Sequence, residues 1–172
     1  MELRTDRLVL RPIAPTDVHD VFRGLSHPDV VRHYGVHCPT LEATREQMDW
    51  YATIAREGTG AWWAVRSAAD DTFLGAIGLN NIMASHRRGE LGFWLMPAHW
   101  RKGYIAEALP AVIDHAFNSL GLHRLMAEVE TGNTASANVL RRAGFTQEGT
   151  LRECEVKAGG YLSLDVFALL DK

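Results

Sequence analysis

The chain has few of the features that mark several classes of protein. Its 172 residues include only two cysteines, Cys38 and Cys154, which is too few for the disulfide framework of a small secreted domain. No apolar run approaches the roughly 20 residues of a membrane-spanning helix. The charged N-terminal residues do not resemble the apolar stretch of a signal peptide. The composition therefore predicts a cytoplasmic protein with free thiols and no contact with a membrane.

An excess of basic residues is also missing. The 18 Lys and Arg residues face 21 Asp and Glu residues, and the formal net charge is -3 at pH 7. Because nucleic-acid-binding domains usually carry a basic surface, this charge argues against nucleic acid as a direct partner. Hydrophobic residues make up 47% of the chain, enough for a packed core. Since domains usually have about 100–200 residues, we expect one domain over residues 1–172.

The hydrophobic pattern predicts a mixed α/β protein. We expect strands over residues 7–13, 61–66, 73–79, 88–95, 122–129, 145–151 and 161–170. Helices are expected over residues 16–25, directly after Pro28, and over residues 41–57, 104–120 and 133–143. This order describes a mixed sheet of about seven strands with helices on both faces. Pro110 falls inside the fourth helix, where a proline predicts a kink.

Capping residues support several of these helix boundaries. Thr16 or Asp17 is expected to cap the first helix, Thr40 the third and Asn133 the last, because these short polar side chains accept bonds from free N–H groups. Gly58 and other glycines stand where helices are expected to end, as the left-handed conformation after a helix requires.

The most informative segment covers residues 100–109. An apolar strand pattern ends at Pro97, and a helical pattern begins at about Tyr104, with Arg101, Lys102 and Gly103 in the junction. A strand that turns into a helix through such a loop directs unpaired N–H groups and the positive end of the helix dipole at one place. The alternative is an ordinary turn before a helix. With the basic flanking residues, the segment predicts a site for an anion, most often a phosphate.

A second motif begins at Asn133 and continues through Ser136, Asn138, Gly144 and Phe145. Together with the 100–109 segment, it resembles the GNAT superfamily of acetyl-CoA-dependent N-acetyltransferases. The resemblance is greatest to the branch that acetylates ribosomal-protein N-termini (RimJ/RimL-like). Residues 5–12, 90–94 and 148–165 also look similar to that branch, so the likeness covers nearly the whole chain. It implies the GNAT fold, with a central, mostly antiparallel sheet flanked by helices.

The resemblance also implies which residues bind the cofactor, acetyl-CoA. The family loop has the form Gln/Arg-x-x-Gly-x-Gly/Ala and holds the pyrophosphate through backbone amides. Here Trp100 replaces the first residue, Gly103 is retained, and Ile105 departs from the small residue usual at the last position. The edge of the preceding strand is expected to meet the pantetheine amides. The implied cofactor residues are Phe93, Trp94, Leu95, Met96, Arg101, Lys102, Gly103, Tyr104, Ile105, Ala106, Asn133, Ser136 and Asn138.

Acetyl transfer to an amine requires a neutral amine, a stabilised oxyanion and a protonated leaving thiolate. Many GNAT enzymes use a tyrosine as the acid, but Leu140 stands at that position here. The resemblance instead assigns the role to Ser136, and a main-chain N–H of the 95–96 segment is the candidate oxyanion donor. Glu155 is the first candidate base and Glu90 the second. Each of these residues also has a simpler interpretation, Ser136 as a residue of a first helical turn and Glu155 as a solvated charge.

The acceptor is expected to be a protein N-terminus. An α-amino group with a pKa of about 7.7–8.0 is already roughly 10–15% neutral at pH 7, whereas a lysine near 10.4 is neutral in only ~0.04% of molecules. The sequence shows no obvious strong base, which favours the first kind of amine. Two alternatives stay open: a GNAT enzyme for a small amine such as an antibiotic, polyamine or amino acid, and a non-enzymatic module that binds coenzyme A. Relatives of this kind are often dimeric, so a homodimer is one outcome.

Other chemistry is expected to be absent. His33, His37 and Cys38 superficially resemble a metal cluster, but Gly35 interrupts any helix there and no further ligand stands nearby, so no metal site is expected. Neither cysteine has a neighbouring histidine pattern that would support a covalent thiol intermediate. The expected reaction is therefore direct transfer from acetyl-CoA to the amine.

Overall fold

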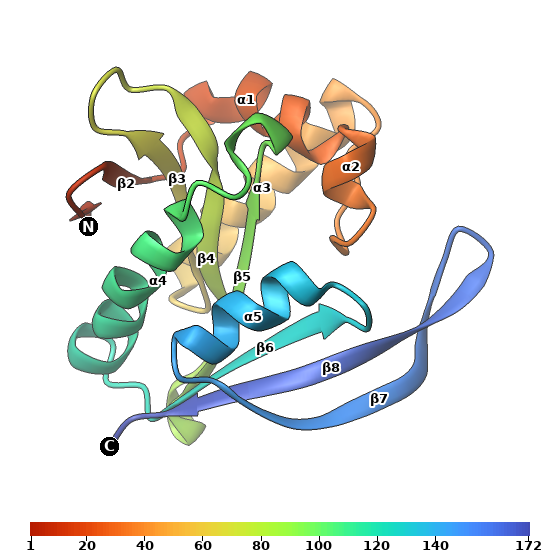
Figure 1. Ribbon diagram of the computed structural model, residues 1–172. Coiled ribbons are helices and arrows are strands. Elements are labelled where there is room, and N and C mark those ends of the chain that lie inside the picture. Colours follow the sequence, from red (N-terminus) through yellow and green to blue (C-terminus); the bar gives the residue numbers. More distant parts are fainter.

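An eight-stranded sheet forms the centre of the protein, which we describe from a computed structural model covering residues 1–172 (Figure 1). The strands lie in the order β1-β2-β3-β4-β5-β6-β8-β7. Their bounds are Leu3–Arg4 (β1), Leu8–Pro12 (β2), Ala61–Ser67 (β3), Phe73–Met83 (β4), Arg88–Leu95 (β5), Arg124–Glu130 (β6), Thr146–Lys157 (β7) and Gly160–Leu170 (β8). The helices are Val18–Leu25 (α1), Pro28–Val31 (α2), Leu41–Glu57 (α3), Tyr104–Asp114 (α4) and Thr134–Arg142 (α5).

All neighbouring strands pair antiparallel except β5 and β6, which are parallel. The expected mixed, mostly antiparallel sheet is thus confirmed. The strand beyond the expected seven is β1, a two-residue strand in which Leu3 pairs with Leu10 of β2. Two residues are too few for an alternating pattern, so periodicity alone gives no signal for β1.

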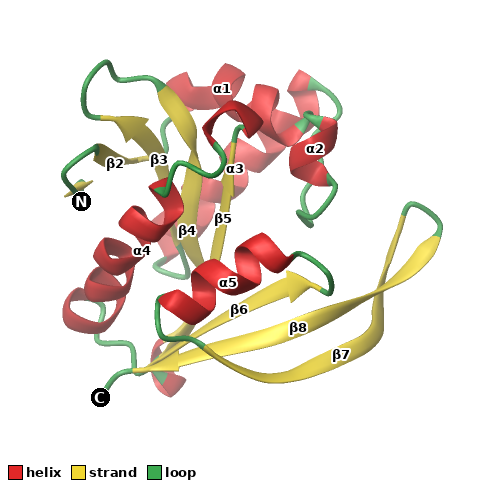
Figure 2. Ribbon diagram, in the orientation of Figure 1, coloured by secondary structure: helices red, strands yellow, loops and turns green.

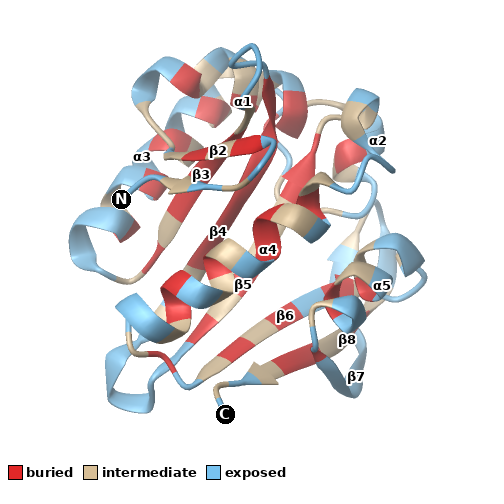
Figure 3. Cartoon of the chain, turned by 60° about the vertical axis from the view of Figure 1, so that its left-hand side comes forward, coloured by how far each residue is buried: buried red, intermediate tan, exposed pale blue.

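Helices cover both faces of the sheet (Figure 2). On one face, α4 and α5 pack over a core of 22 buried residues that includes Leu8, Ile77 and Phe167. On the other face, α1 and α3 pack over a second core of 12 buried residues that includes Trp62 and Trp94. Alternate residues of β3, β4 and β5 enter alternate cores, as the period of two in a strand requires. Buried residues accordingly follow the strands and the inner sides of the helices (Figure 3).

Local capping chemistry sets the helix ends. The Thr40 hydroxyl accepts from the Ala43 N–H at 3.1 Å, and α3 ends at Gly58 with φ of 70°. Pro110 lies inside α4, which continues to Asp114 and is followed by a π-helical turn over His115–Ser119. Pro110 and Ala106 are both exposed, so the Ala106 carbonyl that loses its helical donor faces water. The helix therefore tolerates the proline.

The C-terminal hairpin extends further than the sequence pattern predicts. β7 was expected over residues 145–151 but runs to Lys157, with a register shift between Leu151 and Glu155. Nearly every residue of β7 is exposed. A strand with no buried face carries no alternation of apolar and polar residues, and its length therefore cannot be read from the sequence.

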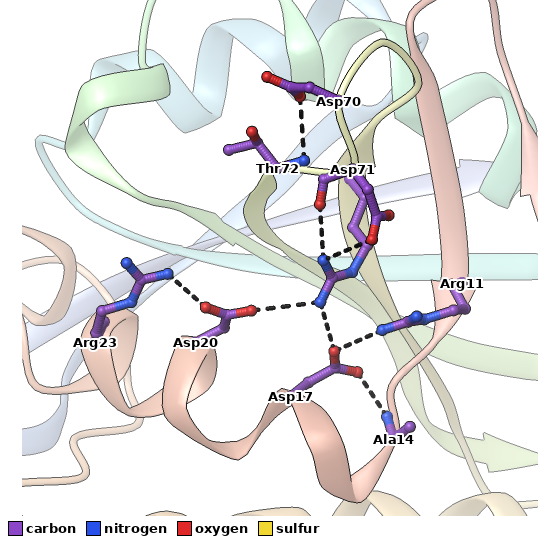
Figure 4. Close-up of polar contacts among 9 residues, drawn as sticks. Arg11, Ala14, Asp17, Asp20, Arg23, Asp70, Asp71 and Thr72 are labelled. Atoms are coloured by element: carbon purple, nitrogen blue, oxygen red, sulfur yellow. Dashed lines mark hydrogen bonds and ion pairs between the residues drawn. The ribbon is translucent and has the colours of Figure 1, made fainter.

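Asp17 does not cap α1 with its side chain, although it occupies the N-cap position. Its carboxylate is fully buried and accepts from Arg11 Nη2 and Arg66 Nη2, both at 2.7 Å, and from the Ala14 N–H at 2.8 Å. Arg66 also bonds Asp20 and Asp71 (Figure 4). This ion network joins the start of α1 to β2 and β3.

Gly24 of α1 lies directly against the Trp94 ring. A Cβ added at Gly24 would stand 2.0 Å from Trp94 Cζ3, whereas one added at Gly35 would meet nothing within 4 Å. We expect Gly24→Ala to lower the free energy of unfolding by up to about 2 kcal/mol, because overpacking costs about 1–3 kcal/mol and helix propensity returns roughly 1 kcal/mol. Gly35→Ala is the control, with little change expected. Urea denaturation measures both, and an unchanged stability of Gly24→Ala would contradict this packing.

Candidate functional site

The sheet opens between its two halves. β5 and β6 pair only from Arg88 to Glu90 and from Arg124 to Met126. Beyond these residues β5 continues to Leu95 and β6 to Glu130 without pairing to each other. Backbone groups along the facing edges are therefore left free of the sheet ladder.

A cavity of about 680 Å³ lies at this opening. From the α4–α5 side it is lined by the loop before α4 and the first turn of α5. From the α1–α3 side it is lined by Asp29, Val30, His33 and Tyr34 of α2 and the loop that follows. The cavity thus reaches from one helical layer to the other through the gap between the strands. Its volume falls within the range of about 300–1,000 Å³ typical of ligand pockets.

The loop before α4 presents free backbone donors. Arg101 and Gly103 adopt left-handed conformations with φ of 60° and 78°, and Tyr104 begins the helix. None of the N–H groups of residues 101–106 donates to a backbone carbonyl. Arg101, Gly103, Tyr104, Ile105 and Ala106 line the cavity, whereas Lys102 does not. Free N–H groups at a helix N-terminus suit the phosphate oxygens of a cofactor.

Of residues 93–96, which were expected to meet the pantetheine arm, Met96 does not line the cavity. The Met96 N–H donates to Leu74 O at 2.8 Å, and its carbonyl accepts from the His99 N–H, so Met96 is turned away from the cavity. Since bonding direction alternates along an antiparallel strand, Phe93 and Leu95 turn their backbone groups toward the gap. The Leu95 carbonyl accepts from Trp100 Nε1 at 2.8 Å, which leaves the Leu95 N–H as the donor there. Phe93, Trp94 and Leu95 line the cavity.

The start of α5 faces the same cavity. Asn133 Oδ1 accepts from the Ser136 N–H at 3.3 Å, as expected for an N-cap, and both residues line the cavity. Asn138 does not: it is exposed and accepts from Arg141 Nη1 at 3.4 Å. Side chains three or four positions apart share a face of a helix. Asn138 is only two positions from Ser136, so it points to a different side of α5. The N-termini of α4 and α5 therefore supply two positive dipole ends to one cavity.

Two ionisable groups that line the cavity, His99 and Tyr34, are uncharged at pH 7, whereas Asp29, Arg101 and Arg142 also line it. Burial and the neighbouring Lys102 lower the pKa of His99, so its ring is neutral at pH 7. Burial raises the pKa of Tyr34 well above its ordinary value, and Tyr51 and Cys38 add to this shift, so its hydroxyl keeps its proton.

The loop carrying Tyr34 is bonded to the other half of the sheet, because Lys157 Nζ donates to Arg32 O at 2.8 Å and pairs with Glu130.

The two candidate bases lie on the α1–α3 face of the sheet. Glu90 alternates with Leu91, which enters the α4–α5 core, and accepts from Asn81 Nδ2 at 2.8 Å. Glu155 is exposed on β7, opposite Leu162. Neither residue lines the cavity. Both nevertheless lie near a third carboxylate, Glu128 of β6.

Glu128 is the functional candidate that sequence reasoning missed. Glu128 is an exposed residue, but its partial burial raises its pKa, and the negative charges of Glu90 and Glu155 raise it further. Its neighbours Ala127 and Val129 enter the α4–α5 core, so Glu128 faces the opposite side. It stands two residues beyond the last β5–β6 pair, where the gap has opened. The alternation of Glu128 with the apolar Ala127 and Val129 was the available signal, but only the fold brings Glu90 and Glu155 close enough to influence it.

Two other classes of site receive no support from the geometry. No group of three or more His, Cys, Asp or Glu side chains is placed to hold a metal ion. No helix is both long enough and apolar enough to cross a membrane.

Comparison with known proteins agrees with this geometry. A sequence profile described as "Acetyltransferase (GNAT) domain" matches residues 7–146. An uncharacterized N-acetyltransferase, YoaA of Bacillus subtilis (strain 168), is 32% identical over 169 residues, which cover 98% of this chain and 96% of that protein. The ribosomal-protein-serine acetyltransferase of Escherichia coli (strain K12) is 32% identical over 99 residues, 58% of this chain and 55% of that protein.

Solved structures show the same fold. RimL, a ribosomal L7/L12 alpha-N-protein acetyltransferase crystallised in complex with coenzyme A, superposes with a TM-score of 0.90. The match covers 99% of this chain and 98% of RimL at 19% sequence identity.

Proposed function

Since the chain belongs to the GNAT acetyltransferase family and is an acetyl-CoA-dependent N-acetyltransferase, we propose that its acceptor is the α-amino group of a protein N-terminus. The observation that carries this proposal is the cavity at the β5–β6 gap. The free amides of the loop before α4 line it, and Glu128 of β6 stands beside the gap on the other face of the sheet, outside the cavity lining. The cofactor is proposed to enter from the α4–α5 side and the amine from the α1–α3 side.

Acetyl-CoA, when bound, supplies the acetyl group as a thioester. We assign the amides of residues 101–106 to its pyrophosphate and the free edge of β5 to its pantetheine arm. The pocket offers donors but no lysine-based phosphate loop, and the two helix dipoles add to the attraction for an anion. Met96 and Asn138 are left out of this assignment, because both are turned away from the cavity.

The protein groups then divide the acid–base work. Glu128 is assigned as the base that takes the amine proton, because its raised pKa makes it a better proton acceptor than an ordinary carboxylate. Glu90 and Glu155 maintain that pKa by repulsion. The Leu95 N–H is assigned to stabilise negative charge on the acyl oxygen. Ser136, in the first turn of α5, is assigned to hydrogen-bond the leaving sulfur.

Two considerations support an N-terminal acceptor. Two relatives with a substrate in their names act on ribosomal proteins, although another, from Vibrio cholerae, is a spermidine N(1)-acetyltransferase. A carboxylate base also suits an α-amino group, which needs less help to lose its proton at pH 7 than a lysine does. A polyamine is the second candidate, because three carboxylates beside the opening would attract an acceptor with several positive charges.

Incubation with acetyl-CoA and a panel of acceptors tests the proposal. We expect peptides with a free N-terminus to gain one acetyl group by intact-mass analysis, and the same peptides with a blocked N-terminus and an internal lysine to gain none. Spermidine and free amino acids are the small-amine arms of the panel.

Acetylation of spermidine in preference to every peptide would replace the N-terminal proposal with the polyamine one. Binding of coenzyme A without transfer to any peptide or to spermidine would overturn both acceptor proposals. Thermal stabilisation by coenzyme A serves as the internal check, because a ligand that binds only the folded state raises the melting temperature.

A further inference from the structure

Glu107 of α4 receives three donors from a segment 100 residues earlier in the chain. Its Oε1 accepts from the Thr5 hydroxyl and from the Arg7 N–H at 2.8 Å, and its Oε2 accepts from Arg7 Nε at 2.6 Å. The Glu107 side chain is only 20% exposed. Burial acts to raise the pKa of Glu107, but the bonds from Thr5 and Arg7 outweigh it and lower the pKa. The carboxylate is therefore ionised and fully engaged at neutral pH.

Arg7 continues this connection to the loop before α4. Its Nη1 donates to the carbonyl of Lys102 at 3.2 Å, and its guanidinium lies 4.8 Å from the centre of the Tyr104 ring. Its Nη2 stands 3.6 Å from the position that a Cβ on Gly103 would take. One guanidinium thus contacts Lys102 and Tyr104 and stands beside Gly103 between them, while Glu107 fixes its orientation.

The hydrogen bond from Arg7 to the Lys102 carbonyl also sets the direction of the Gly103 N–H, because the peptide bond between them is planar. In a trans peptide the carbonyl of one residue and the N–H of the next point in opposite directions. The Lys102 carbonyl is held outward by Arg7, so the Gly103 N–H is directed to the other side, toward the cavity that Gly103 lines. Without that hold, the Lys102–Gly103 peptide could rotate, because Arg101 and Gly103 adopt left-handed conformations on either side of it.

We propose that Glu107 and Arg7 are positioning residues for the cofactor, which act by fixing the Lys102–Gly103 peptide with its N–H toward the pyrophosphate. This inference rests on the proposed place of the cofactor at residues 101–106. The N-terminal segment before β2 is accordingly part of the cofactor site, although it does not line the main cavity.

The test measures coenzyme A binding by calorimetry rather than turnover. Arg7→Met and Glu107→Gln are each expected to weaken the Kd for coenzyme A about 10-fold, the lower end for loss of one hydrogen bond to a charged group. Because the two residues act through one contact, the double variant is expected to be no weaker than the weaker single variant. In steady-state assays the KM for acetyl-CoA is expected to rise while the acceptor KM stays constant.

Arg4→Met is the matched control, since Arg4 is an exposed arginine of the same segment that pairs only with Glu2. It is expected to leave the Kd unchanged. A Kd within twofold of the wild type for both Arg7→Met and Glu107→Gln would overturn the inference, as would additive losses in the double variant. A general loss of structure, seen as a lower melting temperature and a lower apparent kcat with both KM values unchanged, would also overturn it.

Gly103→Val separates this inference from the proposed function. A β-branched residue at φ of 78° strains the loop itself. If Gly103→Val weakens coenzyme A binding and Arg7→Met does not, the loop is the cofactor site but the positioning role is wrong. If neither variant changes the Kd, the proposed cofactor site is wrong as well.

Discussion

Replacing Glu128 with glutamine is expected to lower kcat/KM for the acceptor about 100-fold at pH 7, the lower end of the usual contribution of a general base. Glutamine has nearly the same shape but cannot take a proton, so the fold and the Kd for coenzyme A should be unchanged. The deficit should become smaller as the pH approaches 9, because the α-amino group then loses its proton without help. Steady-state kinetics from pH 5 to 9 provides the measurement.

The neighbouring glutamates give this prediction its controls. The pKa of Glu128 is raised, so the wild-type kcat/KM should increase with pH as Glu128 loses its proton above the ordinary range of a carboxyl. Glu90→Gln and Glu155→Gln each remove one repulsive charge, which lowers that pKa and moves the acid limb of the profile to lower pH. Smaller losses of rate are expected for both. If Glu155→Gln abolished activity and Glu128→Gln did not, the base would be Glu155.

Asp17→Ala is expected to lower the free energy of unfolding by about 3–5 kcal/mol, because it leaves two arginines next to a buried site without their counter-charge. Arg66 is the more affected of the two, since only 12% of its side chain is exposed. For a chain of this length the change corresponds to a fall of about 6–20 °C in melting temperature. Calorimetry or urea denaturation measures it.

Two further variants test the cause of that loss. Asp49→Asn changes an exposed aspartate of α3 and should leave the stability unchanged. The triple variant Asp17→Leu, Arg11→Met and Arg66→Met removes the buried carboxylate together with both of its arginines. Most of the stability should return, because Asp20 keeps its pair with Arg23 and the carboxylate of Asp71 is exposed to water. A triple variant as unstable as Asp17→Ala would show that backbone packing around α1, rather than charge, is what Asp17 supports.

The amino-acid sequence by itself determined the features that depend on neighbours along the chain. Thr40 and Asn133 cap their helices as the pattern predicts, and Gly58 ends α3 in a left-handed conformation. These outcomes follow from backbone donors within three residues of a short polar side chain. The two family motifs likewise indicate the fold and the cofactor from the sequence alone. The loop before α4 is a local structure, so its residues are contiguous in the chain.

Periodicity was less informative where no face is buried. The far end of β7 is exposed on both sides, and its pattern therefore contains no alternation that would extend the strand beyond Leu151. The apolar spacing of α4 was more informative than its proline: the helix continues past Pro110, which lies on the water-facing side, to Asp114.

Only the tertiary structure decided which residues share the site. Glu90, Glu128 and Glu155 come from three strands, and their meeting depends on strand order and on the parallel pairing that ends at Glu90. The Met96 amide is turned to β4 and the Leu95 amide to the gap, a difference of one residue set by register. Arg7 reaches the loop before α4 across 95 residues of sequence. Contacts of this kind depend on the packing of segments that are distant in the sequence. Sequence patterns describe local structure and do not show which distant residues lie close together.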